Sequence, residues 1–151
     1  MNWSEFEELF PPCQEPAEQQ RAPVDRFAWF NLSSRAQIEV TGSDRASFLH
    51  NFCTQDVKRL SPGRGAEAFV TNIKGRIVGH LLVFAGEQTH WLDAPPGAAG
   101  TLLPHLDRYI ISEDVQLRDC SGQWNEIAVI GPQAAGLIAQ LAPESERFGT
   151  L

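Results

Sequence analysis

A histidine and an aspartate that could face each other across a β-hairpin carry the clearest chemical signal in this sequence. Residues 77–85 form a long apolar strand in the prediction, residues 88–93 form the next strand, and Gly86 and Glu87 between them suit a two-residue hairpin loop. The register of such a loop pairs His80 with Asp93, Leu82 with Trp91, Phe84 with Thr89 and Ala85 with Gln88. This group could form a small pocket with one polar end. The alternative is an ordinary cross-strand pair at the solvent-exposed end of a hairpin.

A second feature is a basic interval in an otherwise acidic chain. Its lysines and arginines are Lys58, Arg59, Arg64, Lys74 and Arg76, and the interval contains a single acid, Glu67. Such a cluster could receive an anionic ligand, because guanidinium and ammonium groups pair with carboxylates and phosphates. It could equally be solvated loop charge. The pattern alone leaves both interpretations open.

Motifs that would assign a reaction directly are absent from the sequence. It has no phosphate loop, no dinucleotide fingerprint, no HExxH and no GxSxG turn. The four histidines do not have metal-site spacing with the cysteines, so we assign no metal ligand and no catalytic residue. Cys13, Cys53 and Cys120 would leave one thiol over if two were bridged, which indicates reduced thiols, a cytoplasmic protein, and Cys53 as a small core residue.

The rest of the chain is organised around residues 37–57. Ile38 and Val40 alternate with polar residues, as in a strand with one buried face. Ser43 or Asp44 can accept the free N–H groups of a helix that begins there. One face of this helix is apolar, with Ala46, Phe48, Leu49, Phe52 and Cys53. The opposite side is either solvated or faces a ligand, and it carries Ser47, His50, Asn51 and Thr54.

Strands and helices alternate along the remaining chain. Strands are predicted over residues 27–32, 66–71, 77–85, 88–93, 115–119 and 126–130, with helices over 98–109 and from Pro132 onward. Pro104 predicts either a kink in the middle helix or a later start. This pattern indicates an α+β fold with a mainly antiparallel sheet and two to three packed helices. Residues 1–26 read as an extension with a short helix and a proline-rich linker, and residues 27–151 as one domain.

Composition sets outer limits on the function. With 151 residues, 42% hydrophobic and 21% charged, the chain suits one soluble compact domain. No apolar run approaches the length of a bilayer span. A formal net charge of -7 argues against direct nucleic-acid binding.

Five segments closely resemble, in this order, the N-terminal half of the folate-binding GcvT/YgfZ superfamily. They are LSSR (32–35), VTGSDRASFLHNFCTQDV (40–57), PGRGAEAFVTNIKGRIVGHLLVF (62–84), HLDRYIISEDVQLRD (105–119) and IGPQAA (130–135). The superfamily includes the glycine-cleavage aminomethyltransferase (T-protein) and YgfZ-type proteins that support iron–sulfur enzymes and tRNA modification. The resemblance covers residues 27–140 and implies tetrahydrofolate as the ligand. The cofactor-binding residues that it implies are His80, Leu82, Phe84, Trp91 and Asp93, with Lys74 or Arg76 for a glutamate tail and Asn51 facing the ligand.

The sequence departs from the aminomethyltransferase branch at one functional position. Where that branch has a pair of aspartates, this chain has Gly79 and His80. An imidazole cannot replace a carboxylate that must stabilise positive charge on a folate nitrogen. The resemblance therefore implies a folate-binding-type domain without aminomethyltransferase activity. Two alternatives stay open, an active one-carbon transferase and an accessory protein-binding subunit or truncated remnant.

The family fold is built from two related halves, and this chain ends at Leu151 before a second half begins. The KGCYxGQE motif that marks the second half of the YgfZ branch is also absent. An isolated half would leave a sheet edge open. We therefore expect a homodimer, or association with a chain that supplies a second half-domain.

Overall fold

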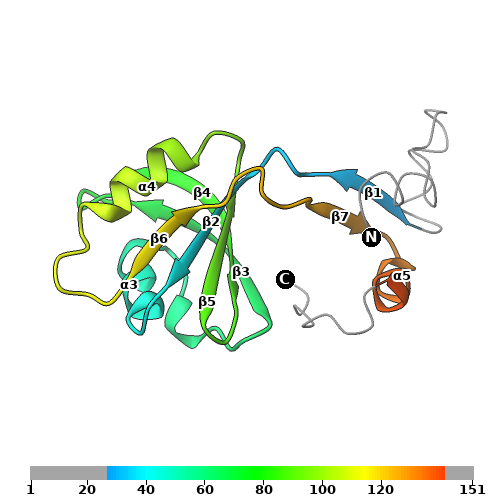
Figure 1. Cartoon of the computed structure of the whole chain (residues 1–151), viewed down its shortest axis with the longest axis horizontal. Helices are drawn as coiled ribbons and strands as arrows, with labels where there is room; N and C mark the ends of the chain where they lie inside the picture. The colour runs from blue at the N-terminus through cyan, green and yellow to red at the C-terminus, as the bar shows by residue number, and fades with distance from the viewer. Residues whose placement is uncertain (1–26, 142–151) are drawn as a thin grey trace. The chain divides into compact units, whose positions relative to one another are not determined.

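The computed structural model describes residues 27–141, which divide into two units (Figure 1). The sheet unit spans Ser34–Trp124, and the ribbon unit contains the described residues up to Ser33 and from Asn125 onward. The helix and linker predicted in residues 1–26 lie outside the described residues and stay predictions. Across residues 27–141, no helix is long and apolar enough to cross a bilayer.

The sheet unit is built on five antiparallel strands in the order β3-β4-β5-β2-β6. Its strands are β2 (Ala36–Thr41), β3 (Arg64–Thr71), β4 (Ile77–Ala85), β5 (Thr89–Ala94) and β6 (Gln116–Asp119). Its helices are α3 (Arg45–Phe52), the 3-10 turn η1 (Val57–Arg59) and α4 (Ala99–Asp107). The predicted α+β class with a mainly antiparallel sheet is confirmed.

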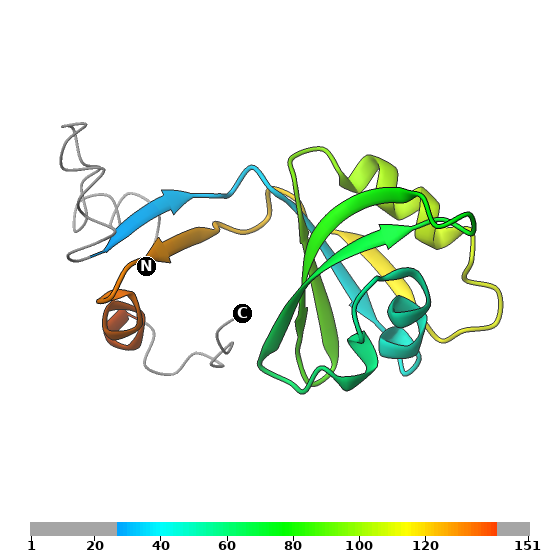
Figure 2. The same cartoon turned by 180° about the vertical axis from the view of Figure 1, so that it is seen from behind.

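Both helices cover the same side of this sheet, as the two opposite views show (Figures 1 and 2). Leu49 of α3 and Leu102 of α4 are completely buried in one core with alternate residues of the central strands. On β4 these buried residues are Leu81, Val83 and Ala85, while the residues between them are half-buried. We call the helix-covered side the core face of the sheet and the opposite side the outer face.

The hydrogen bonds at the start of α3 differ from the predicted side-chain cap. The helix begins at Arg45, as expected, but neither Ser43 nor Asp44 caps it with its side chain. The Asp114 carboxylate accepts hydrogen bonds from both the N–H and the hydroxyl of Ser43, each 2.9 Å long, and the Asp114 N–H donates to the Asp44 carboxylate at 2.9 Å. The predicted cap is therefore wrong because these side chains bind the loop before β6 instead.

Helix α4 runs through its proline. It starts at Ala99, so the alternative of a late start at Pro104 is wrong. Leu102 and Leu106 are fully buried, and His105 Nε2 lies 3.2 Å from the carbonyl oxygen of Thr71 on β3. Burial of this face stabilises the helix in spite of the backbone N–H that Pro104 lacks.

The β4–β5 hairpin differs from its predicted register by two residues. Ala85 pairs with His90, not Gln88, so four residues lie between these two partners, and the Gly86 N–H donates to the Thr89 carbonyl at 2.7 Å. A shift of two residues keeps every side chain on its predicted face but changes its partner. Phe84 lies opposite Trp91, and Asp93 lies opposite Leu82 instead of His80. The predicted cross-strand pair of His80 and Asp93 is therefore wrong.

The ribbon unit consists of two strands and a helix. They are β1 (Ala28–Asn31), β7 (Ile127–Ile130) and α5 (Ala134–Leu141). The strands pair antiparallel, with Ala28 opposite Ile130. Both strands agree with the prediction to within a residue. The helix begins at Ala134, two residues later than predicted, because a turn joining the Ala134 N–H to the Gly131 carbonyl comes first.

Candidate functional site

The outer face of the sheet carries a row of aromatic side chains. Phe84 on β4 and Trp91 on β5 are directly opposite each other and half-buried. The Trp91 ring meets the ring of Trp124 edge-on at a centroid distance of 6.0 Å. We call Phe84, Trp91 and Trp124 the aromatic row. Neither α3 nor α4 covers this face, because both pack on the core face.

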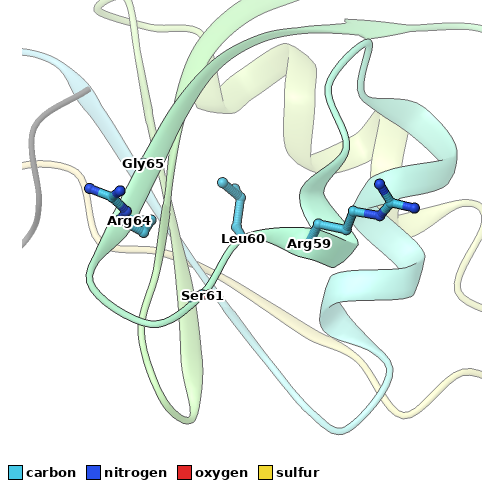
Figure 3. Close-up of a pocket in the computed structure, with 5 residues that line it drawn as sticks. All are labelled: Arg59, Leu60, Ser61, Arg64 and Gly65. Carbon is cyan, nitrogen blue, oxygen red and sulfur yellow. The ribbon is translucent and has the colours of Figure 1, made fainter.

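A hollow of about 410 Å³ lies between the end of η1 and the start of β3, and we call it the arginine hollow (Figure 3). It is lined by Arg59, Leu60, Ser61, Arg64 and Gly65. The Leu60 side chain lies between the two arginines, whose guanidinium groups point to opposite sides (Figure 3). Arg59 is 87% exposed and contacts the Asp56 carboxylate at 3.3 Å. The hollow therefore offers two separated positive charges with apolar surface between them.

Gly65 connects the hollow to the aromatic row. It lines the hollow, and it is also the residue on β3 directly opposite Phe84. Cross-strand neighbours have Cα atoms about 5 Å apart, so the hollow and Phe84 lie at the same end of the sheet. Together the two features suit an elongated ligand with a flat ring system at one end and anionic groups at the other.

The structure separates several of the predicted site residues. His80 Nε2 lies 2.7 Å from a carboxylate oxygen of Glu67 on β3. Asp93 is buried and its carboxylate accepts a 2.6 Å hydrogen bond from Arg35 Nε. Leu82, Phe84, Trp91 and Asp93 share the outer face with His80, as predicted, but His80 and Asp93 have different partners and do not form one polar end.

Lys74 and Arg76 lie in the exposed turn between β3 and β4. The Asn72 side-chain oxygen holds this turn by accepting hydrogen bonds from the Lys74 and Arg76 backbone N–H groups at 2.9 and 3.1 Å. Phe84 lies eight positions after Arg76 along the chain, a span of roughly 26 Å at 3.3 Å per residue. These two side chains can therefore serve a ligand beside His80, but they lie far from the aromatic row.

Asn51 is separated from the outer face altogether. It is exposed on α3, and α3 packs on the core face. Its neighbour His50 has Nδ1 3.4 Å from the Asp56 carboxylate. The sheet therefore stands between Asn51 and the aromatic row.

Sequence reasoning missed the arginine hollow as a site. The sequence pattern marks Arg59 and Arg64 only as members of the basic interval and does not mark Ser61. The signal that could have found them is the pairing of β3 with β4, because a register that places Gly65 opposite Phe84 brings Arg64 to the same end of the sheet. That register depends on a bulge between Val70 and Thr71, which the sequence pattern does not reveal.

The buried titratable groups are not poised for nucleophilic chemistry. Burial raises the pKa of the Cys53 thiol to about 12 and also raises the pKa of Cys120, so both remain protonated at neutral pH. Burial, with a smaller contribution from the charge of Arg45, lowers the pKa of His90 to about 4. Neither ring nitrogen of His90 has a hydrogen-bond partner. Within residues 27–141, no cluster of His, Cys, Asp and Glu could hold a metal ion.

Comparisons with known proteins agree on one family. The family model for the GCVT N-terminal domain matches residues 8–149. An aminomethyltransferase of Corynebacterium aurimucosum is 28% identical over 131 residues, covering 86% of this chain and 35% of that protein. The glycine cleavage system aminomethyltransferase T from Bartonella henselae has a similar structure, with a TM-score of 0.71 at 22% identity, covering 82% of this chain and 34% of that chain. The chain thus spans about a third of the length of these relatives.

These comparisons confirm the predicted resemblance to the N-terminal half of the GcvT-type fold. The structural likeness has low sequence identity and concerns the fold, whereas the family model covers almost the whole chain. The chain belongs to the GCVT N-terminal domain family.

Proposed function

We propose that this protein binds a tetrahydrofolate-type ligand on the outer face of the sheet, with its flat rings on the aromatic row and its carboxylates at the arginine hollow. The observation that carries the proposal is the position of Gly65, which lines the hollow and lies opposite Phe84. A tetrahydrofolate has a pterin whose pyrimidine part is planar, a second ring that is aromatic and an anionic glutamate, in that order. The aromatic row and the arginine hollow therefore fit the ligand in their chemistry and in the order in which they would contact it.

The two parts of the site would contribute differently to binding. Stacking on an aromatic ring stabilises a complex by about 0.5–1.5 kcal/mol beyond the effect of buried area. Exposed arginine–carboxylate pairs contribute at most about 1 kcal/mol and weaken as salt rises. The aromatic row should therefore set most of the affinity, and the arginine hollow should set the preference for an anionic ligand.

We infer further that the protein binds this ligand without transferring an aminomethyl group. Gly79 faces the core, where an added Cβ would lie 2.9 Å from Leu102 Cδ2, so an aspartate there would be buried against a leucine. His80 contacts Glu67 and supplies no free carboxylate. The role that fits such a binding domain is that of the YgfZ branch, in the cytoplasm, supporting iron–sulfur enzymes or tRNA modification.

Removal of an aromatic ring tests the first part of the site. We expect Trp91→Ala and Phe84→Ala each to weaken tetrahydrofolate binding at least about tenfold, the equivalent of about 1.4 kcal/mol. Isothermal titration calorimetry gives the affinity, and urea denaturation checks that each variant is folded. Ile73→Ala is the matched control, because Ile73 is 84% exposed in the distant β3–β4 turn. Equal affinity in wild type and both aromatic variants would contradict the proposed site.

Removal of the arginines tests the second part. We expect the double variant Arg59→Ala/Arg64→Ala to weaken tetrahydrofolate binding severalfold and to flatten its dependence on salt, since fewer charge pairs remain to be screened. Binding of a pterin without glutamate should not change. The same substitutions at Lys74 and Arg76 are the control, because those residues were predicted from sequence to hold the glutamate tail. A loss of affinity only in the Lys74→Ala/Arg76→Ala variant would move the anionic end to the β3–β4 turn.

A one-carbon transferase is the second candidate, because the similar Corynebacterium aurimucosum protein is an aminomethyltransferase. This function predicts turnover of an aminomethyl donor with tetrahydrofolate. Wild type and His80→Asp should be assayed side by side, since the variant restores a carboxylate at the position that departs from the transferase branch. Inactivity of both proteins would exclude this candidate, and turnover by the wild type would replace our proposal.

A further inference from the structure

Glu39 extends the line of cross-strand partners that carries the aromatic row. It lies on β2 directly opposite Trp91, just as Phe84 lies opposite Trp91 from β4. Directly paired residues of antiparallel strands point to the same face of a sheet, so the Glu39 side chain belongs to the outer face. The Cα atoms of such a pair are about 5 Å apart. Glu39 therefore lies next to Trp91, on the side away from Phe84.

The Glu39 carboxylate is held in place by Arg118 on β6. Nε and Nη2 of Arg118 both contact the same oxygen, Glu39 Oε2, at 2.7 Å. Among the described residues, no hydrogen bond or ion pair reaches the other oxygen, Oε1. The Glu39 side chain is 19% exposed, so part of it is accessible from solvent. Oε1 therefore keeps its capacity to accept hydrogen bonds from a ligand.

The pterin of a tetrahydrofolate carries the donors that such an acceptor binds. Its pyrimidine part has an exocyclic amino group next to a ring N–H, and both groups donate hydrogen bonds. Hydrogen bonds to an ionised acceptor are about twice as strong as bonds between neutral groups. Trp91 supplies an aromatic surface on which the planar part of the ring can stack. The neighbouring pair of Glu39 and Trp91 can thus contact both the edge and the face of the pterin.

We propose that Glu39 recognises the pterin ring by accepting hydrogen bonds from its exocyclic amino group and ring N–H while the ring stacks on Trp91. This inference rests on the proposed function and deepens it, because it makes the exocyclic amino group the feature that selects the ligand. It also orients the ligand. Glu39 and Arg118 are a pair of opposite charges with no net charge, so the glutamate tail is attracted to the arginine hollow instead.

Isothermal titration calorimetry tests the inference with tetrahydrofolate and its oxo analogue, in which oxygen replaces the exocyclic amino group. The wild type should prefer tetrahydrofolate at least about tenfold, because the carboxylate would face the oxygen of the analogue with no hydrogen between them. Glu39→Gln should weaken tetrahydrofolate binding at least about tenfold, since the charged acceptor is lost. It should also reduce or reverse the preference, because the amide can donate a hydrogen bond to the oxo group. Urea denaturation checks that the variant is folded.

Glu87→Gln is the matched control, because it makes the same substitution at an exposed glutamate of the β4–β5 loop. It should bind both ligands like the wild type. If the folded wild type does not bind tetrahydrofolate, the proposed function and this inference both fail. If the wild type binds tetrahydrofolate but binds the oxo analogue equally well, only this inference fails, whatever the stability of the variant. Unchanged binding by Glu39→Gln, an equal loss for both ligands, or the same loss in Glu87→Gln would also overturn it.

Discussion

Replacement of Gly42 by alanine is expected to destabilise the sheet unit by more than about 4 kcal/mol, which is a large part of the roughly 5–15 kcal/mol that stabilises a typical domain. Gly42 has a φ of +104°, a conformation that side chains rarely adopt. A Cβ at this position would also overlap the carbonyl oxygen of Asp114. That atom belongs to the backbone of a loop held by hydrogen bonds with Ser43 and Asp44, so it cannot turn away as a flexible side chain could.

Gly75→Ala separates the two causes of this loss. Gly75 also has a positive φ, +70°, but nothing lies within 4 Å of an added Cβ. Replacement of Gly75 by alanine should therefore lower the free energy of unfolding only by the cost of the left-handed backbone conformation, about 1–2 kcal/mol. Urea denaturation followed by circular dichroism measures both variants against wild type. Equal losses for the two glycines would show that the contact with Asp114 is unimportant and that backbone conformation alone matters.

Acid is expected to destabilise the protein through His90. The pKa of this buried histidine is about 4, below the ordinary value of about 6.5 that it regains on unfolding. The unfolded chain therefore takes up the proton first as the pH falls. The stability due to neutral His90 is complete above about pH 6.5 and is lost progressively down to about pH 4, amounting to about 3 kcal/mol.

His90→Leu should remove this part of the pH dependence. Leucine suits the surroundings of His90, which include its cross-strand partners Val40 and Ala85 and leave both imidazole nitrogens without hydrogen bonds. We therefore expect the variant to be at least as stable as wild type at pH 7, and its advantage to grow toward pH 4. The measurement is the free energy of unfolding at several pH values. Parallel pH profiles for the two proteins would contradict this role of His90.

Local sequence patterns predicted most of the elements in the described part of the chain. Alternating residues such as Ile38 and Val40 gave β2, and the helical stripe containing Phe48 and Leu49 gave α3, because these periodicities directly reflect burial. The side-chain cap of α3 was not predictable in the same way. Asp114 is distant in sequence from Ser43, and tertiary hydrogen bonds replaced the local one.

The site could not be predicted fully from the sequence, because its geometry depends on which residues of neighbouring strands are paired. Gly86 and Glu87 suit a two-residue loop, yet three residues separate β4 from β5, and Trp91 lies opposite Phe84. The predicted face of each side chain is correct, because a shift of two residues preserves the alternation of faces along the strand. The predicted His80–Asp93 pair is wrong, because the same shift changes the cross-strand partner of every residue. The arginine hollow is lined by residues 59–65 alone, but its position near Phe84 depends on the pairing of β3 with β4, which no local pattern encodes.

The most direct test of the account is a map of amide chemical shifts by NMR during a titration with tetrahydrofolate. We predict saturable changes that concentrate at Gly65, Phe84 and Trp91 and in the arginine hollow, with little change at Asn51 on the other side of the sheet. The absence of saturable changes in a folded protein would contradict folate binding. Changes concentrated on α3 would contradict the outer face as the binding site.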